Sequence, residues 1–422
     1  MKKYDLIVIG GGLTGVAASV SAAREGLSVL LVEKSGCLGG AMSTNLVYPF
    51  MRYWTRNEEI RGEENNVVRY LSGGIFKEMR DREKKYTSKY SDMRFRPEHF
   101  KFVLDDMVTD AGVEVLFHSS LYDVKTENDI LKGVWITTVS GNIYFEANFF
   151  IDATGDGNLF ALAGCDYQLG RESDGLCQPM TTCFRISGVD LEEFSKDRTM
   201  LQEKYKELQN AGKIENPREN ILTFLGIGEG ILHLNTTRVV KLDPTNPFER
   251  SKAEILARRQ VYEMECFLKE HSKAFENSTI ISIASEIGVR ESRKLNGVYV
   301  LTVEDLKNLT YFDDAIALGN YDIDIHNPSG SGTSHYYFKG DDHYSIPYRS
   351  LLPKEYKNLL VAGRCISTTH EAQASIRIMP ICATLGQAAG TAAAVAHNTG
   401  KNAHTVDTAL LRKTLIKNGA IL

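Results

Sequence analysis

The chain of 422 residues contains no CxxC pair, and its seven cysteines are scattered from Cys37 to Cys382. An odd, scattered set argues against a disulfide framework or a zinc knuckle, both of which need suitably spaced cysteines. We therefore expect no metal site, a reducing cytoplasmic location, and cysteines that serve mostly as small buried apolar residues.

Long runs of one kind of residue are also missing. No block of Lys or Arg stands out in a chain of formal net charge −5, which disfavours nucleic acid or an anionic membrane surface as a partner. The first apolar stretch, Leu6 to Ala18, is interrupted by four glycines that would break a secretory helix. No other segment approaches the roughly 18 apolar residues of a membrane span, so we expect no membrane insertion.

What is present is an ordinary balance of 43% hydrophobic and 24% charged residues, over a length that accommodates two or three domains. Near the amino terminus, Tyr4–Ile9 is typical of a buried strand, Leu13–Glu25 of an alanine-rich helix, and Ser28–Val32 of a second strand. This βαβ unit predicts an α/β protein with a doubly wound parallel sheet.

The rest of the chain changes character twice. Trp54 to Tyr90 is polar and charged, which predicts a surface excursion with a short helix near Val67–Arg80. A strand pattern returns at Leu359–Ala362, and a helix rich in Ala and Gly follows over Ile376–His397. We therefore predict a discontinuous first domain with an α+β substrate domain inserted in it, the first at residues 1–175 and 341–422 and the second at residues 176–340.

The strongest local motif is Gly10-x-Gly12-x-x-Gly15, between the first predicted strand and helix, with Glu33 about twenty residues later at the end of the next strand. The first glycine makes a tight turn, the second lets backbone approach a pyrophosphate, and the third lets the helix pack closely on the strand. Helix N–H groups can then hold the anion, while Glu33 accepts hydrogen bonds from ribose hydroxyls and disfavours a 2′-phosphate. The motif predicts a Rossmann-type dinucleotide-binding domain.

Several segments resemble the flavoprotein superfamily that includes glutathione reductase and fumarate reductase, namely Tyr4–Gly12, Glu33-Lys34, Gly39-Gly40 and Ile151–Gly157. Three further segments resemble a bacterial family of FAD-dependent oxidoreductases, namely Leu234–Arg238, Ile287–Arg293, and Leu360–Arg364 with His370, Arg377 and Gly386–Gly390. The resemblance spans nearly the whole chain and implies FAD as the cofactor. The motif and the resemblance together predict these FAD-binding residues: Gly10, Gly12, Leu13, Thr14, Gly15, Glu33, Lys34, Gly39, Gly40, Ala41, Thr44, Ala153, Thr154, Gly155, Asp156, Gly363, Arg364 and Gly386.

The resemblance also excludes some flavin chemistry. Disulfide reductases carry two cysteines soon after the Gly-Gly turn, whereas this chain has Ala41-Met42-Ser43-Thr44-Asn45 there and only Cys37 before it. Relatives that tether FAD covalently use a histidine just after these glycines, but no histidine occurs between Gly39 and Asp92, so we expect non-covalent FAD. No cysteine cluster supports an iron–sulfur centre, so electrons would pass to or from a second substrate, oxygen or a separate carrier.

One position departs from the superfamily. Many relatives have an acidic residue after the last glycine turn, where this chain has Arg364. Whether Arg364 contacts FAD therefore stays open.

Hydride exchange at flavin N5 needs an acid or base for the accompanying proton and a cation for any substrate carboxylate. His370 and Arg377 are the best candidates, because the resemblance places their segment beside the flavin and because imidazole and guanidinium suit these tasks. The alternative is that His370 caps or packs a helix and Arg377 makes a structural ion pair. Arg290 and Arg293 are further candidates, which either pair with acidic neighbours or face a polar substrate.

The sequence therefore predicts an FAD-dependent oxidoreductase, a dehydrogenase or reductase, that exchanges hydride between flavin N5 and a polar small molecule. The alternative is a non-redox flavoprotein in which FAD is structural or assists a hydration or isomerisation. A third hypothesis is an NAD-binding sensor without catalysis. The substrate, the reaction direction, the electron donor or acceptor, and any homo-oligomer are left open.

Overall fold

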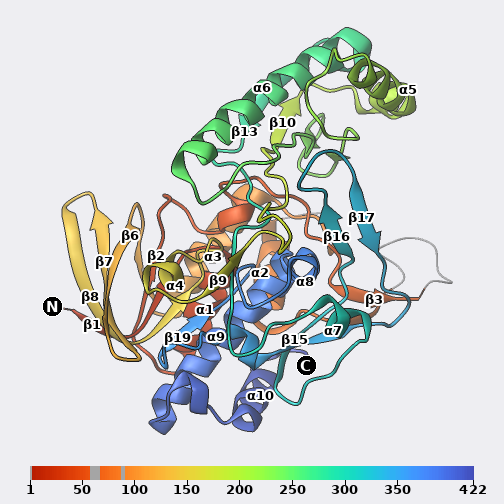
Figure 1. Cartoon of the computed structure of the whole chain (residues 1–422). Helices are drawn as coiled ribbons and strands as arrows, with labels where there is room; N and C mark the ends of the chain where they lie inside the picture. The colour runs from red at the N-terminus through yellow and green to blue at the C-terminus, as the bar shows by residue number, and fades with distance from the viewer. Residues whose placement is uncertain (1, 58–66, 87–90) are drawn as a thin grey trace.

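The computed structural model describes residues 2–57, 67–86 and 91–422, and its largest element is a seven-stranded sheet (Figure 1). The strand order is β5 (Glu114–Leu116), β2 (Val29–Val32), β1 (Lys3–Ile9), β8 (Gly141–Asp152), β7 (Ile130–Thr138) and β6 (Ser120–Glu127), with β19 (Leu359–Val361) also paired to β8. β5, β2, β1, β8 and β19 run parallel, whereas β6, β7 and β8 form an antiparallel meander. The predicted α/β class with a parallel Rossmann-type sheet is confirmed.

The long strand β8 joins the two ends of the chain. Phe150 in β8 pairs with Ile7 on one side and with Leu359 on the other, so a strand from the last quarter of the sequence completes the sheet. All three side chains are fully buried and apolar, which is why the strands carry continuous apolar runs rather than an alternation.

Two helices with small residues pack tightly beside this sheet. α1 (Leu13–Arg24) lies against α9 (Met379–Thr399), where a Cβ on Gly386 would come within 2.1 Å of the Thr14 carbonyl oxygen. The helix predicted over Ile376–His397 corresponds to α9, and a separate short helix, α8 (His370–Ile376), comes before it. Pro380 sits in the first turn of α9, the position that tolerates its missing N–H group.

α9 also corrects an expectation from the sequence. In the described part of the chain it is the one helix whose length and hydropathy would suit a membrane span, so the expectation that no such segment exists is wrong. Its alanines and glycines raise the hydropathy, and 94% of its apolar window is buried inside the protein, as in the core helix of a folded domain.

The predicted surface excursion from Trp54 to Tyr90 is wrong in its first part. Trp54 is 1% exposed in β3 (Trp54–Arg56), which pairs with β4 (Val67–Tyr70), and α2 (Gly74–Glu83) begins only after that strand. The Trp54 ring packs edge-on against Tyr53 and Tyr70, so aromatic contacts override the polar sequence around them. Residues 58–66 and 87–90 of this stretch lie outside the described residues.

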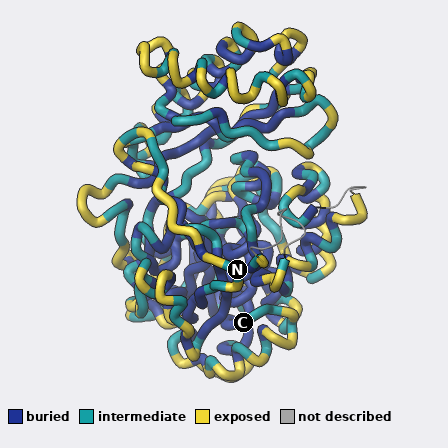
Figure 2. The backbone as a smooth tube through the Cα atoms, turned by 90° about the vertical axis from the view of Figure 1, so that its right-hand side faces the viewer, coloured by how far each residue is buried: buried dark blue, intermediate teal, exposed yellow. Residues whose placement is uncertain are grey.

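A second layer stands above the main sheet (Figure 1). Its sheet has the order β11 (Thr223–Phe224), β12 (Leu232–Leu234), β10 (Phe184–Ser187) and β13 (Thr279–Ile283). The helices α5 (Leu191–Asn210) and α6 (Pro247–His271) cover this sheet and share with it a core of their own. Figure 2 shows this layer as a thinner part of the molecule, with more exposed chain than the dark body below it.

The remaining elements are short and are as follows: β9 (Tyr167–Leu169) with β14 (Arg293–Leu295), β15 (Ala315–Gly319) with β18 (Tyr344–Pro347), β16 (Ile323–His326) with β17 (Thr333–Tyr336), and α3 (Pro97–Asp110), α4 (Asn158–Leu162), α7 (Val303–Lys307) and α10 (Thr408–Lys417). The domain division into residues 1–175 plus 341–422 and residues 176–340 stays a prediction. Within the inserted part, Phe184 to Phe275 hold the second core, whereas buried residues from Leu295 to Phe338 join the first.

Candidate functional site

A cavity of about 1010 Å³ lies at the carboxyl-terminal ends of the parallel strands. The residues that follow β1, β2, β8 and β19 all line it, and so does the segment around Gly288 that approaches from the second layer. Parallel α/β sheets bind their ligands at this edge, because the loops after neighbouring strands converge there.

The glycine turn after β1 has the geometry that the motif predicts. Gly10 has φ +104°, and a Cβ there would come within 2.5 Å of the Ala153 carbonyl oxygen. A Cβ on Gly15 would come within 1.7 Å of the Gly10 carbonyl oxygen, so only glycine lets α1 lie this close to the turn. A Cβ on Gly12 would have one neighbour, 4.0 Å away, which leaves open space beside the helix start.

The amino terminus of α1 is free of the usual side-chain partners. The cap residue is Gly12, which has no side chain that could cap the helix, and the first turn holds no acidic residue. Gly12, Leu13 and Thr14 line the cavity. The backbone N–H groups of the first turn, which no cap side chain satisfies among the described residues, and the positive end of the helix dipole therefore suit a bound anion such as a pyrophosphate.

Most of the predicted FAD-binding residues meet at this cavity. Those that line it are Gly10, Gly12, Leu13, Thr14, Glu33, Lys34, Gly39, Gly40, Ala41, Thr44, Ala153, Thr154, Gly155, Asp156, Gly363 and Arg364. Gly15 and Gly386 do not line it: both are buried where α1 packs on its neighbours, so their contribution is close packing.

Glu33 is held in one orientation at the end of β2. One carboxylate oxygen accepts a hydrogen bond from the Gly11 N–H at 2.6 Å, and the other accepts from the Ser35 N–H at 2.8 Å and the Ser35 hydroxyl at 2.7 Å. The side chain is 6% exposed and lines the cavity. A fixed carboxylate at the end of this strand suits a ribose hydroxyl group.

Arg364 is compensated by an acidic residue from another loop. Its guanidinium donates to Asp156, which also accepts from Arg250 at 3.0 Å and from the Ser292 hydroxyl at 2.9 Å. Burial would raise the pKa of Asp156, but Arg364 and Arg250 beside it lower that pKa to about 2. Arg364 thus stands on the cavity wall with Asp156 as its ionised partner.

His370 is placed away from the cavity wall. Its Nδ1 lies 2.7 Å from a carboxylate oxygen of Glu291, which is fully buried and also binds Lys294 at 2.6 Å. The Glu291 carboxylate further accepts from the Gln178 N–H at 2.9 Å. His370 thus pairs with a buried carboxylate, and its role in proton transfer stays a prediction.

The other predicted reaction residues do line the cavity. Arg290 donates to the Pro179 carbonyl at 2.6 Å and to the Thr181 hydroxyl at 2.5 Å, and Arg377 lies 3.5 Å from the Asp324 carboxylate. Arg293 lies nearer the FAD-binding loops, where it donates to the Asp156 carbonyl at 3.1 Å.

Sequence reasoning missed the polar cluster that accompanies Arg290 and Arg377. Arg218, Glu219, Tyr321, Asp324 and His326 line the same end of the cavity. A signal for two of them exists in the sequence, since Asp324 and His326 are two residues apart in a strand and such residues share a face.

Asp324 is the centre of that cluster. Its carboxylate accepts from the Tyr321 hydroxyl at 3.1 Å and lies 3.3 Å from Nε2 of His326. Burial raises the pKa of Asp324, but the contact with His326 and the charge of Arg377 outweigh it and hold that pKa well below its usual range. Burial and the neighbouring Asp324 carboxylate raise the pKa of Tyr321, so the phenol keeps its proton at neutral pH.

The fold and the cavity define a dinucleotide-binding protein of the Rossmann type, with a polar compartment beside the nucleotide site. The residues fit FAD: the turn leaves room at Gly12, the start of α1 offers free N–H groups, and Glu33 presents a fixed carboxylate. The chain belongs to the family of FAD-dependent oxidoreductases, whose family model matches residues 5–415. FAD is therefore its cofactor, and the match supports this family rather than the particular branch of glutathione reductase or fumarate reductase.

Two curated proteins are similar over short segments. One is glycerol-3-phosphate dehydrogenase of Synechocystis, 46% identical over 52 residues that make up 12% of this chain and 9% of that protein. The other is dihydrolipoamide dehydrogenase of Chaetomium thermophilum, 50% identical over 36 residues, which are 8% of this chain and 7% of that protein. The similarity thus spans less than a tenth of either relative.

Solved structures are similar over more of the chain. A geranylgeranyl bacteriochlorophyll reductase-like protein of Thermoplasma acidophilum has a TM-score of 0.48 and 14% identity, over 100% of this chain and 85% of the other. A flavin-dependent brominase has a TM-score of 0.49 and 13% identity, over 98% of this chain and 83% of the other.

Proposed function

We propose that this protein is a dehydrogenase or reductase that exchanges hydride between non-covalently held FAD and a polar small molecule. The observation that carries the proposal is the single cavity that joins the glycine turn after β1 to a wall of arginine, carboxylate and tyrosine side chains. When bound, FAD supplies a group that accepts or gives hydride. A polar compartment opening on the same cavity is where a substrate carbon would meet that group.

The cofactor side of the cavity divides by chemistry. The N–H groups at the start of α1 would hold the pyrophosphate, and Glu33 would hold the ribose hydroxyls. Arg364, held by its ion pair with Asp156, contributes N–H donors to the cofactor side.

The substrate side supplies orientation and a proton site. Arg377 would orient a polar group of the substrate. We place the proton-handling role on Tyr321, because this residue lines the cavity and its hydroxyl is held by Asp324. The sequence predicts His370 for that role. His370 does not line the cavity, so it would act without direct contact with a substrate there.

A first experiment tests the flavin chemistry itself. The absorption spectrum of the purified protein is recorded before and after acid release, and the holoprotein is then titrated anaerobically with sugars, hydroxy acids and amines. Bleaching of the flavin bands by one compound supports hydride exchange and identifies its substrate class. Flavin that stays with the precipitated protein would contradict the non-covalent assignment.

The same preparation separates the alternatives. Isomerisation or hydration of a compound without any electron donor or acceptor would favour the non-redox flavoprotein. Binding of nicotinamide nucleotide by reconstituted protein that takes up no flavin would favour the sensor. We also propose that a separate electron donor or acceptor takes part in the reaction and that the protein forms a homo-oligomer.

A variant tests the proton site. Tyr321→Phe keeps the ring and removes the hydroxyl, so we expect flavin reduction to slow by about 100-fold or more while FAD stays bound. Tyr262→Phe, at a tyrosine 69% exposed on α6, is the matched control. If His370→Ala slows reduction and Tyr321→Phe does not, the proton site lies at His370.

A further inference from the structure

Several arginines gather in the part of the cavity around Asp324. Arg218, Arg290 and Arg377 line this part, and Arg238 lies directly behind it with 1% of its surface exposed. The carboxylates in this part are Glu219 and Asp324, whereas Glu33, Asp156 and Glu286 line the cavity elsewhere and have partners of their own.

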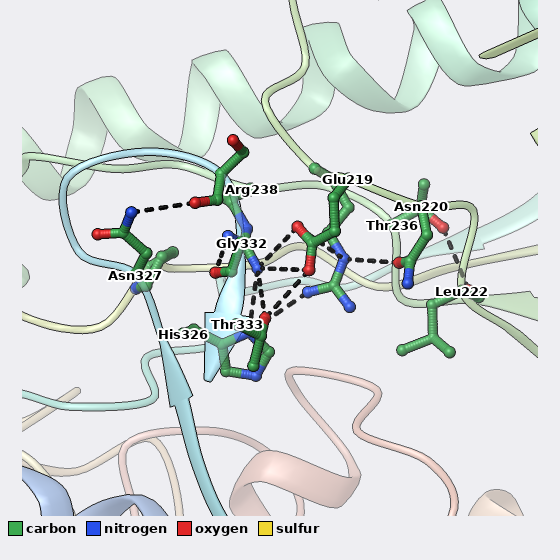
Figure 3. A network of polar contacts seen from close by, with 12 residues as sticks. Glu219, Asn220, Leu222, Thr236, Arg238, His326, Asn327, Gly332 and Thr333 are labelled. Carbon is green, nitrogen blue, oxygen red and sulfur yellow. Dashed lines mark hydrogen bonds and ion pairs between the residues drawn. The ribbon is translucent and has the colours of Figure 1, made fainter. Parts of the chain in front are cut away.

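Both carboxylates are already engaged. Glu219 lies 3.1 Å from Arg238 and accepts from the Thr333 hydroxyl at 3.0 Å, and Figure 3 shows these side chains meeting where the β16–β17 hairpin comes against the chain that carries Glu219. Asp324 faces Arg377 at 3.5 Å and His326 at 3.3 Å. Neither carboxylate lies within ion-pair distance of Arg290 among the described residues.

His326 carries no negative charge that could balance the arginines. Arg238 lies 3.1 Å and Arg218 3.5 Å from its Nδ1, and because a guanidinium only donates, Nδ1 must accept and the proton stays on Nε2. Burial and the charge of Arg290 lower the pKa of His326 well below its usual value, in agreement with a neutral ring.

The balance leaves Arg290 as an uncompensated cation. Its partners in the described residues, the Pro179 carbonyl and the Thr181 hydroxyl, are neutral, and both bind the same nitrogen, Nη1. Burial together with Arg377 and Arg218 lowers the pKa of Arg290 to about 9, which still leaves it charged at neutral pH. Nearby, Nε of Arg377 is buried and makes no hydrogen bond within the part of the chain that the structure describes.

Arg290 is half-buried, and a cation that is partly removed from water without a counter-ion costs free energy. The arrangement is understandable if an anion completes it in the working protein, because charge-assisted hydrogen bonds to a guanidinium are strong and directional.

We propose that Arg290, with Arg377 and Arg218, binds an organic oxyanion, a carboxylate or a phosphate group carried by the substrate. The inference rests on the proposed function in that the anion belongs to the molecule that exchanges hydride. It narrows the substrate from a polar molecule to an anionic one.

Binding of simple probes tests the site without any redox chemistry. Isothermal titration calorimetry of the FAD-loaded protein would compare succinate, its uncharged analogue succinamide, and inorganic phosphate. We expect an anion to bind at least about tenfold more tightly than succinamide, with the preferred anion showing whether a carboxylate or a phosphate is recognised. If neither anion binds more tightly than succinamide, the proposal is overturned.

Variants separate binding from structure. Arg290→Gln should weaken the preferred anion by about 10- to 100-fold, with Arg290→Lys between the two, while Arg259→Gln on the exposed face of α6 should have no effect. Because Arg290→Gln removes a half-buried charge that has no ion-pair partner among the described residues, the thermal midpoint of the FAD-loaded protein without anion should stay the same or rise. A lowered midpoint together with unchanged anion affinity would show that Arg290 is structural.

The two proposals fail in different experiments. Anion binding that depends on Arg290, with no compound bleaching the flavin, would leave the anion site standing and remove hydride exchange. Flavin bleaching by a neutral compound, with no anion bound, would support hydride exchange and remove the anion site.

Discussion

Replacing Asp156 by Asn is expected to destabilise the protein by about 2 kcal/mol at neutral pH. The side chain is 12% exposed and bridges the loop after β8 to Arg364 of the last glycine turn and to Arg250 of α6. The substitution keeps the shape of the side chain and removes its charge, so both arginines lose their common partner.

The magnitude follows from the ionisation of the carboxyl group. Burial on its own would raise the pKa of Asp156, but Arg364 and Arg250 hold it at about 2, against an ordinary value of 3.8. Each unit of difference between folded and unfolded states corresponds to about 1.4 kcal/mol, which gives about 2 kcal/mol above both pKa values.

The sign of the pH dependence is fixed by the same comparison. Because the folded pKa of Asp156 lies below the unfolded one, the contribution is complete above about pH 4 and is lost as the pH falls towards 2. The stability difference between the parent and Asp156→Asn should therefore shrink over that interval.

Urea unfolding, followed by circular dichroism and by flavin fluorescence, measures this difference at neutral pH and near pH 3. Asp174→Asn is the control, since Asp174 pairs with Arg171 at the surface with 38% of its side chain exposed, and a much smaller loss is expected there. Equal losses in the two variants at neutral pH, or a difference that is as large near pH 3 as at neutral pH, would refute the reasoning.

Three further substitutions follow from packing and charge. Gly15→Ala places a Cβ 1.7 Å from the Gly10 carbonyl, so we expect a loss of about 1–3 kcal/mol and a lower ratio of flavin to protein absorbance. Glu291→Gln removes the carboxylate beside His370 in a fully buried pair, and the free energy of unfolding should fall by about 3–5 kcal/mol. His233→Phe should instead raise that free energy by about 1–3 kcal/mol, because neither ring nitrogen has a hydrogen-bond partner among the described residues.

Matched controls distinguish these effects from general damage. Gly330→Ala adds a Cβ that meets no atom within 4 Å, so flavin content and stability should be unchanged. Phe is a fair replacement for His233, whose ring packs edge-on against Tyr48 at 5.5 Å. Burial lowers the pKa of His233 to about 3, so the parent should lose stability as the pH falls below about 6.5, and His233→Phe should lose less.

The nucleotide-binding half could be read from local pattern. Gly10, Gly12 and Gly15 belong to a single turn, and Glu33 follows the adjacent strand. Their roles therefore depend on residues that are close in sequence or paired within the βαβ unit. The same holds for the strand at Leu359–Val361, because a continuous apolar run before a glycine is the pattern of a buried parallel strand.

The substrate half depended on contacts that no local pattern contains. Arg290 and Arg377 were found as residue types, but Arg218, Tyr321 and Asp324 come from other segments and meet them only in the folded chain. His370 contacts Glu291, which lies 79 residues earlier in the sequence. It is therefore absent from the cavity wall, whereas the resemblance predicts a position beside the flavin.

The sequence by itself therefore determined the fold class, the family and the position of the nucleotide site, because hydrophobic periodicity and glycine spacing act over short distances. Only the tertiary structure decided which charges are neutralised. Asp156 forms an ion pair with Arg364, Glu219 with Arg238, and Asp324 with Arg377. Arg290 has no carboxylate within ion-pair distance among the described residues. Electrostatic interactions depend on distance and burial in three dimensions, and neither quantity is contained in the order of the residues.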